Sequence, residues 1–163
     1  MIFSDKTIIH SLEQGRIVIV PWPQSEDIQP SSVDLHLYNQ FQKLNGNKFT
    51  SASYNLLPGQ FILGCTDEWI ELGDDVVGKI EGKSSIGRKG VVIELAGYVD
   101  PGWKGRLTLE LYNASDQVYV LHAGQKICQI RFMSMTTPVL REYGHPNLNS
   151  HYQMSAGTEG AKE

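Results

Sequence analysis

The hydrophobic positions follow a helical pattern only at the start of the chain. In the opening stretch MIFSDKTIIHSLEQGRI, Ile8, Ile9 and Leu12 fall on one face of a helix. Ser4 precedes this face and suits an N-cap, while Gly15 follows it and suits a helix end. The pattern therefore predicts one short N-terminal helix.

After this helix, the apolar residues recur at strand spacing in short runs. The runs are VDLHLYNQF (33–41), QFILGCTDEWIEL (60–72), DVVGKIEG (75–82), GVVIELAGYV (90–99), GRLTLELYN (105–113), VYVLHAG (118–124) and KICQIRFM (126–133). Turn-forming stretches such as NGNK, LPGQ and DPGWKG separate them, which is typical of an all-β barrel or a double-sheet jelly roll. From Gly144 the periodicity ends. The composition predicts one domain, 1–143, followed by a flexible tail, 144–163.

One predicted strand, RLTLELY, carries a glutamate on its polar face. Leucines occupy every second position, and the residues between them are Arg106, Thr108, Glu110 and Tyr112. A glutamate on such a face usually meets water, because a buried one needs a partner. The alternation alone leaves open whether Glu110 is solvated or functional.

Composition and charge narrow the classes of protein. The 163 residues are 40% hydrophobic and 20% charged, as expected for one globular domain. A net charge of −4 argues against nucleic acid or an anionic membrane as partner, and we see no apolar run of membrane-spanning length and no leader pattern. Cys65 and Cys128 lie in apolar contexts. We interpret them as two buried thiols in a reducing cytoplasm, with one disulfide as the alternative.

The sequence lacks the motifs of common metal and nucleophile enzymes. Zinc nucleobase deaminases need His-x-Glu followed by Cys-x-x-Cys, which does not occur here. No Gly-x-Ser-x-Gly elbow and no Walker loop occurs either. The five histidines show no ligand spacing: His10, His36, His122, His145 and His151. We therefore expect no metal held by protein side chains.

The densest polar block is GKIEGKSSIGRKG. Here Lys83 and Arg88 flank two hydroxyls and a glycine, which suits a phosphate-bearing ligand, although a solvated basic turn has the same composition. Asp100 then opens a Pro-Gly turn, where an aspartate often caps its own backbone. Trp103 suits either the core or a platform for a flat ring.

In combination, these segments resemble the dCTP deaminases, members of the trimeric dUTPase superfamily. The matching segments, in the family's order, are QPSSVDL, LPGQFILGCT, EGKSSIGRKG, AGYVDPGWKGRLTLEL and HAGQKICQI. The resemblance covers nearly the whole chain and implies a distorted β-barrel or jelly roll, assembled as a homotrimer with active sites between subunits. The implied reaction converts dCTP into dUTP and ammonia without zinc, and some members continue to dUMP and pyrophosphate. Mg²⁺ would arrive with the triphosphate.

The resemblance also implies roles for residues. Glu110 matches the general acid/base that activates water, the main-chain carbonyl of Ala96 would help to hold that water, and Ser84 and Arg88 would orient the reacting groups. Asp100 would meet the 3′-hydroxyl, and it matches the residue that activates water in dUTPases. The implied substrate contacts are Lys83, Ser84, Ser85, Ile86, Gly87, Arg88, Asp100, Trp103, Thr108, Leu109, Glu110, Gln129, Tyr143 and His151.

Two segments depart from the family pattern. The segment GRKGVVIELAG is one residue shorter than the family's GRLGLxTHxTAG, and Ile93 and Leu95 replace a His and a Thr tied to dTTP feedback inhibition. In the tail, His151 replaces a lysine and Ser155 a glutamine. The shorter spacing resembles dUTPases. However, dUTPases carry an apolar residue at the position of Glu110 and a Gly-rich C-terminal motif that is absent here.

The sequence and the family resemblance leave three alternative functions for this protein. The first is a cytoplasmic, homotrimeric dCTP deaminase that forms dUTP. The second is a dUTP pyrophosphatase, or a bifunctional enzyme that forms dUMP, in which Asp100 activates water at the α-phosphate. Gln129 matches a glutamine present in both branches. The third is a regulatory trimer that binds nucleotide without turnover. The sequence also leaves open a modified cytosine as substrate.

Overall fold

The structure, a computed structural model, describes residues 1–94 and 98–162. It opens with the predicted helix, α1 (Asp5–Glu13), whose N-cap Ser4 accepts a hydrogen bond from the Thr7 amide. The helix ends before Gly15, which adopts a φ of 69°. Ile8 on its inner face is fully buried, whereas Ile9, which the pattern placed on that face, is 41% exposed. None of the helices in the described part of the chain is long and apolar enough to cross a membrane.

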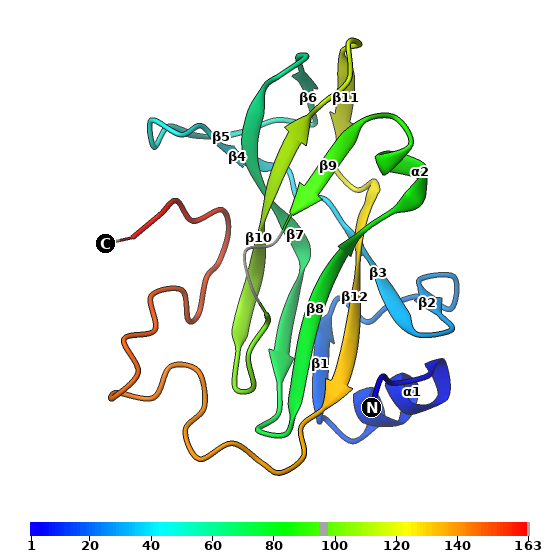
Figure 1. Cartoon of the computed structure of the whole chain (residues 1–163), viewed down its shortest axis with the longest axis vertical. Helices are drawn as coiled ribbons and strands as arrows, with labels where there is room; N and C mark the ends of the chain where they lie inside the picture. Colours follow the sequence, from blue (N-terminus) through cyan, green and yellow to red (C-terminus); the bar gives the residue numbers. More distant parts are fainter. Residues whose placement is uncertain (95–97, 163) are drawn as a thin grey trace.

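Strands dominate the rest of the chain (Figure 1). They are β1 (Ile17–Val20), β2 (Ile28–Gln29), β3 (Ser32–His36), β4 (Gln40–Gln42), β5 (Lys48–Thr50), β6 (Ser53–Leu56), β7 (Phe61–Leu72), β8 (Val76–Gly82), β9 (Val91–Glu94), β10 (Lys104–Asn113), β11 (Tyr119–His122) and β12 (Lys126–Ser134). A second short helix, α2 (Ser84–Gly87), lies between β8 and β9. Each of the seven predicted runs overlaps at least one of these strands.

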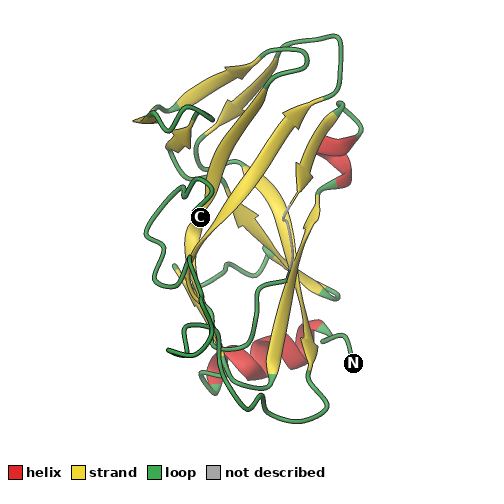
Figure 2. Cartoon of the chain, turned by 60° about the vertical axis from the view of Figure 1, so that its left-hand side comes forward, coloured by secondary structure: helices red, strands yellow, loops and turns green. Residues whose placement is uncertain are grey.

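Antiparallel pairing arranges the described strands in three sheets. The largest has the order β5-β4-β7-β10-β9, with β1 also paired to β7. The second has the order β2-β3-β12-β8, and β6 pairs with β11 in a small third sheet. The sheets curve around one another, with α1 across one end (Figure 2). The prediction of an all-β, distorted jelly roll with a short N-terminal helix is confirmed.

The core determines which face of β10 is buried and which face presents polar side chains. Leu107, Leu109 and Leu111 point inward and are at most 3% exposed, as the alternation predicts. Burial of each such side chain contributes roughly 1.5–3 kcal/mol relative to exposure. Because successive strand residues point to opposite faces, Thr108 and Glu110 face away from the core. The core thereby fixes the orientation of the polar face.

The C-terminal segment follows β10 rather than leaving the domain (Figure 1, orange to red). The Met154 amide donates to Lys104 O at 2.8 Å, and the Arg106 amide donates to Ser155 O at 2.8 Å. Further on, the Glu159 amide donates to Thr108 Oγ1 at 3.0 Å. The segment therefore covers part of the polar face of β10. The division into a domain, 1–143, and a tail remains a prediction.

Candidate functional site

A pocket of about 490 Å³ opens on the polar face of β10. Five predicted site residues line it: Asp100, Trp103, Thr108, Glu110 and Tyr143. Strand β7 and the tail also contribute lining residues, among them Phe61, Leu63, Tyr152, Ser155 and Glu159. The structure therefore brings together residues from the DPGW turn, from β10 and from the tail.

Glu110 occupies the middle of this wall and is half-buried. Its backbone pairs with Leu63 of β7 on one side and with Glu94 of β9 on the other. Among the described residues, none forms an ion pair or hydrogen bond with the Glu110 carboxylate. A carboxylate that faces a pocket beside apolar walls is suitable for accepting and returning a proton. This geometry favours the functional interpretation of Glu110 over the solvated one.

Asp100 reaches the same pocket from a tight turn. The Trp103 amide closes the turn on Asp100 O at 3.0 Å, and Gly102 adopts a φ of 84° within it. A Cβ added at Gly102 would clash with the Cβ of Glu142, so this position requires glycine. Partial burial raises the pKa of the Asp100 carboxyl. The turn thus holds a second carboxylate at the pocket.

Trp103 belongs to the core and also lines the pocket. Its side chain is largely buried, and its indole N–H donates to Gly105 O at 3.2 Å. Its ring also lines the pocket and lies 5.4 Å from the Tyr143 ring. The Tyr143 hydroxyl in turn accepts a hydrogen bond from the Tyr152 amide at 3.1 Å. Two aromatic residues therefore connect the pocket wall to the tail.

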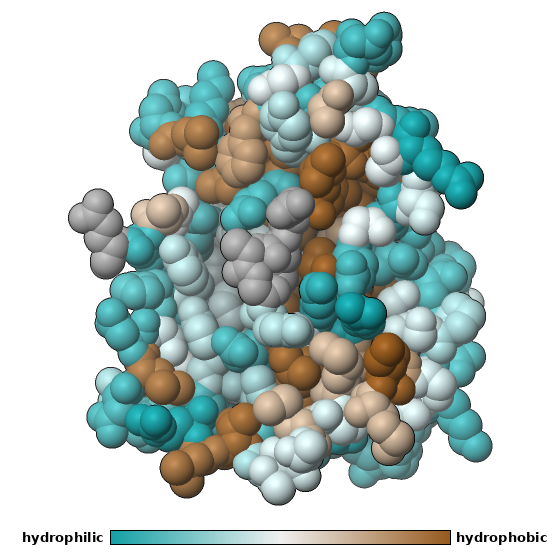
Figure 3. All heavy atoms as spheres, in the orientation of Figure 1, coloured by the Kyte–Doolittle hydropathy of each residue, from teal (hydrophilic) through white to brown (hydrophobic). Residues whose placement is uncertain are grey.

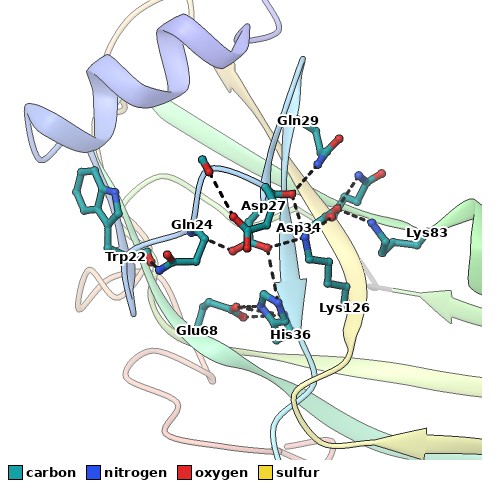
Figure 4. Close-up of polar contacts among 12 residues, drawn as sticks. Trp22, Gln24, Asp27, Gln29, Asp34, His36, Glu68, Lys83 and Lys126 are labelled. Carbon is teal, nitrogen blue, oxygen red and sulfur yellow. Dashed lines mark hydrogen bonds and ion pairs between the residues drawn. The ribbon is translucent and has the colours of Figure 1, made fainter.

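Lys83 and Gln129 lie elsewhere, in a polar network around the buried Asp34 of β3. Figure 4 shows Lys83 beside Asp34. Asp34 is 3% exposed. Its Oδ1 accepts hydrogen bonds from Lys83 Nζ at 2.7 Å and from Gln129 Nε2 at 2.8 Å. On its other side, Asp34 Oδ2 lies 3.4 Å from Lys126 Nζ. One buried carboxylate therefore holds two of the predicted substrate contacts.

The network extends from Lys126 to two further carboxylates. Lys126 Nζ lies 2.8 Å from Asp27 Oδ1, and His36 Nδ1 lies 2.7 Å from Glu68 Oε1. Burial raises the pKa of Asp27, but the hydrogen bond from Lys126 and the surrounding contacts lower it overall. Burial raises the pKa of Glu68, although hydrogen bonds from His36 oppose the shift. No cluster of three or more side chains suited to a metal ion occurs in the part of the chain that the structure describes.

The other predicted residues belong to neither group. Ser84, Ser85, Gly87 and Arg88 are exposed on α2 or directly after it, and Ile86 of the same turn is buried. A short helix replaces the basic turn that the sequence suggested. None of these residues lines the Glu110 pocket.

Three remaining predictions are of different kinds. Leu109 is fully buried, so its side chain faces the core. His151 is half-buried in the tail, with Nε2 lying 3.3 Å from Asn149 Nδ2, and it is not among the residues of the pocket wall. Ala96 lies outside the described residues. Sequence reasoning missed Asp34 and Glu68, although the alternating pattern of VDLH placed a carboxylate between two buried apolar residues.

Comparison with known proteins identifies relatives along almost the whole chain. A profile of the family described as dCTP deaminase-like matches residues 42–135. A "dCTP deaminase, dUMP-forming" from Methanobrevibacter smithii is 38% identical over 183 aligned positions, which cover 99% of this chain and 94% of that protein. A protein of the same name from Dictyoglomus turgidum is 38% identical over 185 positions, with 99% and 94% covered.

Two solved structures share the fold of this chain. The 2′-deoxycytidine 5′-triphosphate deaminase of Agrobacterium tumefaciens superimposes with a TM-score of 0.67 at 20% identity, over 85% of this chain and 49% of that chain. This chain thus spans about half of that structure. A dUTPase from phage phi11 of S. aureus gives a TM-score of 0.57 at 16% identity, over 77% of this chain and 94% of that chain. Likeness at such low identity concerns the fold alone. The profile match and the 38% identity over 99% of the chain go further: this chain belongs to the dCTP deaminase-like family.

Proposed function

We propose that this enzyme deaminates dCTP and then cleaves the product to dUMP and pyrophosphate. The observation that carries the proposal is that Glu110 and Asp100 line the same pocket in a dCTP deaminase-like chain. Relatives that are 38% identical and named dUMP-forming favour this over a deaminase that stops at dUTP. The buried free thiols of Cys65 and Cys128 are consistent with a cytoplasmic enzyme of pyrimidine deoxynucleotide metabolism.

In the deamination step, Glu110 would act as general base and then as general acid. It would take a proton from the water that attacks C4 of cytosine, and it would return a proton to the leaving amine. Water and dCTP would give dUTP and ammonia. This step is proposed without zinc, because the chain lacks the His-x-Glu and Cys-x-x-Cys pattern that supplies the zinc ligands of zinc deaminases. The half-buried position of Glu110 beside Leu63 supports this role, since electrostatic interactions between the carboxyl group and the reacting groups are stronger where less water is present.

In the second step, Asp100 would activate a water that attacks the α-phosphate of dUTP. The products are dUMP and pyrophosphate, and Mg²⁺ carried by the triphosphate would neutralise charge on the leaving group. A mutant of the phi11 dUTPase, a fold neighbour, has a structural Mg(II) ion. Burial raises the pKa of Asp100, so this step should weaken at acidic pH, where the carboxyl is protonated.

The remaining site residues fit a homotrimer in which neighbours share sites. Ser84 and Arg88 are exposed and do not line the Glu110 pocket of their own chain. Tyr112 and Val92, which pair across β10 and β9, leave large apolar side chains 41% and 38% exposed. Figure 3 shows exposed apolar atoms in the upper part of this view and also near its lower edge. Subunit contact would cover Tyr112 and Val92 and would bring α2 of one chain towards the pocket of the next.

The test is one incubation of purified protein with dCTP and Mg²⁺, followed by separation of nucleotides and an ammonia assay. We expect ammonia and dUMP in equal amounts. Glu110→Gln should lower ammonia release by at least about 100-fold, because it removes the proton acceptor and keeps the shape. Asp100→Asn should accumulate dUTP from dCTP. Ammonia release by Glu110→Gln at the parent rate would refute the assignment of the base.

The other outcomes separate the alternatives. Wild-type protein that accumulates dUTP from dCTP would be a deaminase without the second step. Protein that converts only added dUTP would be a pyrophosphatase. Tight nucleotide binding without any product would indicate the regulatory trimer.

A further inference from the structure

We propose that Asp34 is a positioning residue that fixes Lys83 and Gln129 for the phosphates of the nucleotide. This inference rests on the proposed function, because it assumes that these two side chains contact the triphosphate. Asp34 itself is 3% exposed and would not touch the substrate. It would act through the side chains that it holds.

The geometry around Asp34 is specific. Gln129 of β12 is the direct partner of Asp34 in the β12–β3 register, and its amide donates across the strands at 2.8 Å. Lys83 comes from the end of β8, on the other side of β12, and reaches over to the same oxygen atom at 2.7 Å. Both bonds fall within the range of strong hydrogen bonds, and the lysine bond is charge-assisted. One oxygen therefore sets the spacing between an ammonium and an amide.

The charges around Asp34 show why its carboxylate is needed. Lys126 approaches the second oxygen at 3.4 Å and also lies 2.8 Å from Asp27 (Figure 4). Asp34 therefore sits between two lysine ammonium groups. If Asp34 lost its negative charge, no carboxylate among the described residues would remain between Lys83 and Lys126. Lys83 would then leave its position, since like charges repel strongly in a poorly solvated site.

Lys83 also determines where α2 begins. It is the N-cap residue of α2, and its carbonyl accepts from the Ile86 and Gly87 amides at 3.0 and 2.9 Å. Ile86 of α2 is only 5% exposed and packs into the core, which holds the turn in place. The Asp34–Lys83 bond ties the other end of the turn to β3. Together these two contacts orient the exposed hydroxyls of Ser84 and Ser85, which follow Lys83 directly.

The held side chains keep capacity for a ligand. A lysine ammonium has three donors, and Asp34 takes one of those of Lys83. The Lys83 side chain remains 19% exposed, so solvent or a phosphate oxygen can approach it. Gln129 likewise has a second amide hydrogen. The site thus offers two fixed donors beside the hydroxyls of α2.

The test compares Asp34→Asn with Glu68→Gln as a matched control. Glu68 is 5% exposed in the same network, and it contacts His36 but neither Lys83 nor Gln129. Binding of dCTP and of deoxycytidine is measured by calorimetry, which needs no turnover. We expect Asp34→Asn to weaken dCTP binding about 10- to 100-fold and deoxycytidine binding less than threefold. Glu68→Gln should change neither affinity by more than about threefold.

A second variant guards against simple loss of folding. Asp34→Glu keeps the charge between the lysines but moves the carboxylate by one methylene, so the fold should tolerate it while the phosphate affinity still falls. Unchanged dCTP affinity in a folded Asp34→Asn or Asp34→Glu variant would overturn the inference alone. Equal losses for dCTP and deoxycytidine would also overturn it, because they indicate general damage. Wild-type protein that binds no dCTP would remove the proposed function as well.

Discussion

Gln153 is the residue whose replacement should most clearly release the tail from β10. Its Nε2 donates to Gly102 O at 2.8 Å and to Tyr143 O at 3.0 Å, and its Oε1 accepts from the Lys104 amide at 3.0 Å. The side chain therefore joins the tail to the DPGW turn and to the start of β10. In Gln153→Glu, a carboxylate would face two carbonyl oxygens without a donor for either.

The free energy that Gln153→Glu costs for docking of the tail follows from these contacts. Each lost hydrogen bond costs about 1 kcal/mol net, and the repulsion between the carboxylate and two carbonyls adds to this. Because Gln153 is half-buried, solvent screens part of the repulsion, and we expect a total of about 2–3 kcal/mol. That energy shifts the docked tail towards the undocked state by roughly 30- to 150-fold. Tyr143 and Tyr152 would leave the pocket wall with it, so KM for dCTP should rise while kcat at saturation changes little.

The assay combines hydrogen exchange of the tail with steady-state kinetics. Exchange should quicken for the Met154 and Glu159 amides, which now bond to Lys104 O and Thr108 Oγ1. Gln60→Glu is the control, because both contacts of Gln60 can persist with a carboxylate: its oxygen accepts from the Leu57 amide, and the Tyr54 hydroxyl, which now accepts from Gln60 Nε2, can donate instead. Exchange and KM equal to those of the wild type in Gln153→Glu would refute the reasoning.

Three further predictions concern the stability and reactivity of the fold. Asn113→Ala should cost about 3–4 kcal/mol in denaturant unfolding, because its fully buried amide makes four hydrogen bonds; an unchanged midpoint would contradict this. Burial raises the pKa of Cys65 to about 12 and that of Cys128 further still, so both thiols should react with Ellman's reagent only after unfolding, and prompt reaction of native protein would contradict their burial. The pKa of Asp27 is lowered in the fold from its unfolded value of 3.8, so its carboxylate stabilises the fold at pH values above 3.8, and this contribution is lost as the pH falls through the folded pKa. Below about pH 4, the free energy of unfolding should therefore fall less steeply with decreasing pH in Asp27→Asn than in the wild type.

Strand alternation predicted most of the sheet, because long amphipathic strands bury one face completely. β7 and β10 show this best, with every second residue of β10 in the core. The sequence analysis missed β1, β2, β5 and β6, which are two to four residues long. A strand of this length carries too few positions to define a period of two, and its existence depends on the partner strand.

The candidate site was predictable in part, for a related reason. Asp100, Trp103, Thr108 and Glu110 lie within one short segment, so the segment that identified them also placed them near each other. The contact between Asp34 and Lys83 joins residues 49 positions apart. It depends on the order β3-β12-β8, in which β12 separates the two strands. No local pattern specifies such an order.

Ile93 shows how the shortened segment remains compatible with the fold. It pairs with Leu111 across β9 and β10 and packs, half-buried, against the core. An apolar side chain at this position adds packing and requires no hydrogen-bond partner. Packing at Val91 and Ile93 therefore favours the antiparallel register in which Glu94 pairs with Glu110.

The two groups of predicted residues lie on different sheets of one chain, and this arrangement bears on the assembly. The Glu110 pocket belongs to the sheet of β7 and β10, whereas Lys83 and Gln129 belong to the sheet of β8 and β12. A motif specifies residue types along the chain but not which copy of the chain supplies each one. In the homotrimer proposed above, the two groups would come from different subunits and would contact one nucleotide. The Asp34 network would then prepare one subunit's donors for a base held by another's Glu110.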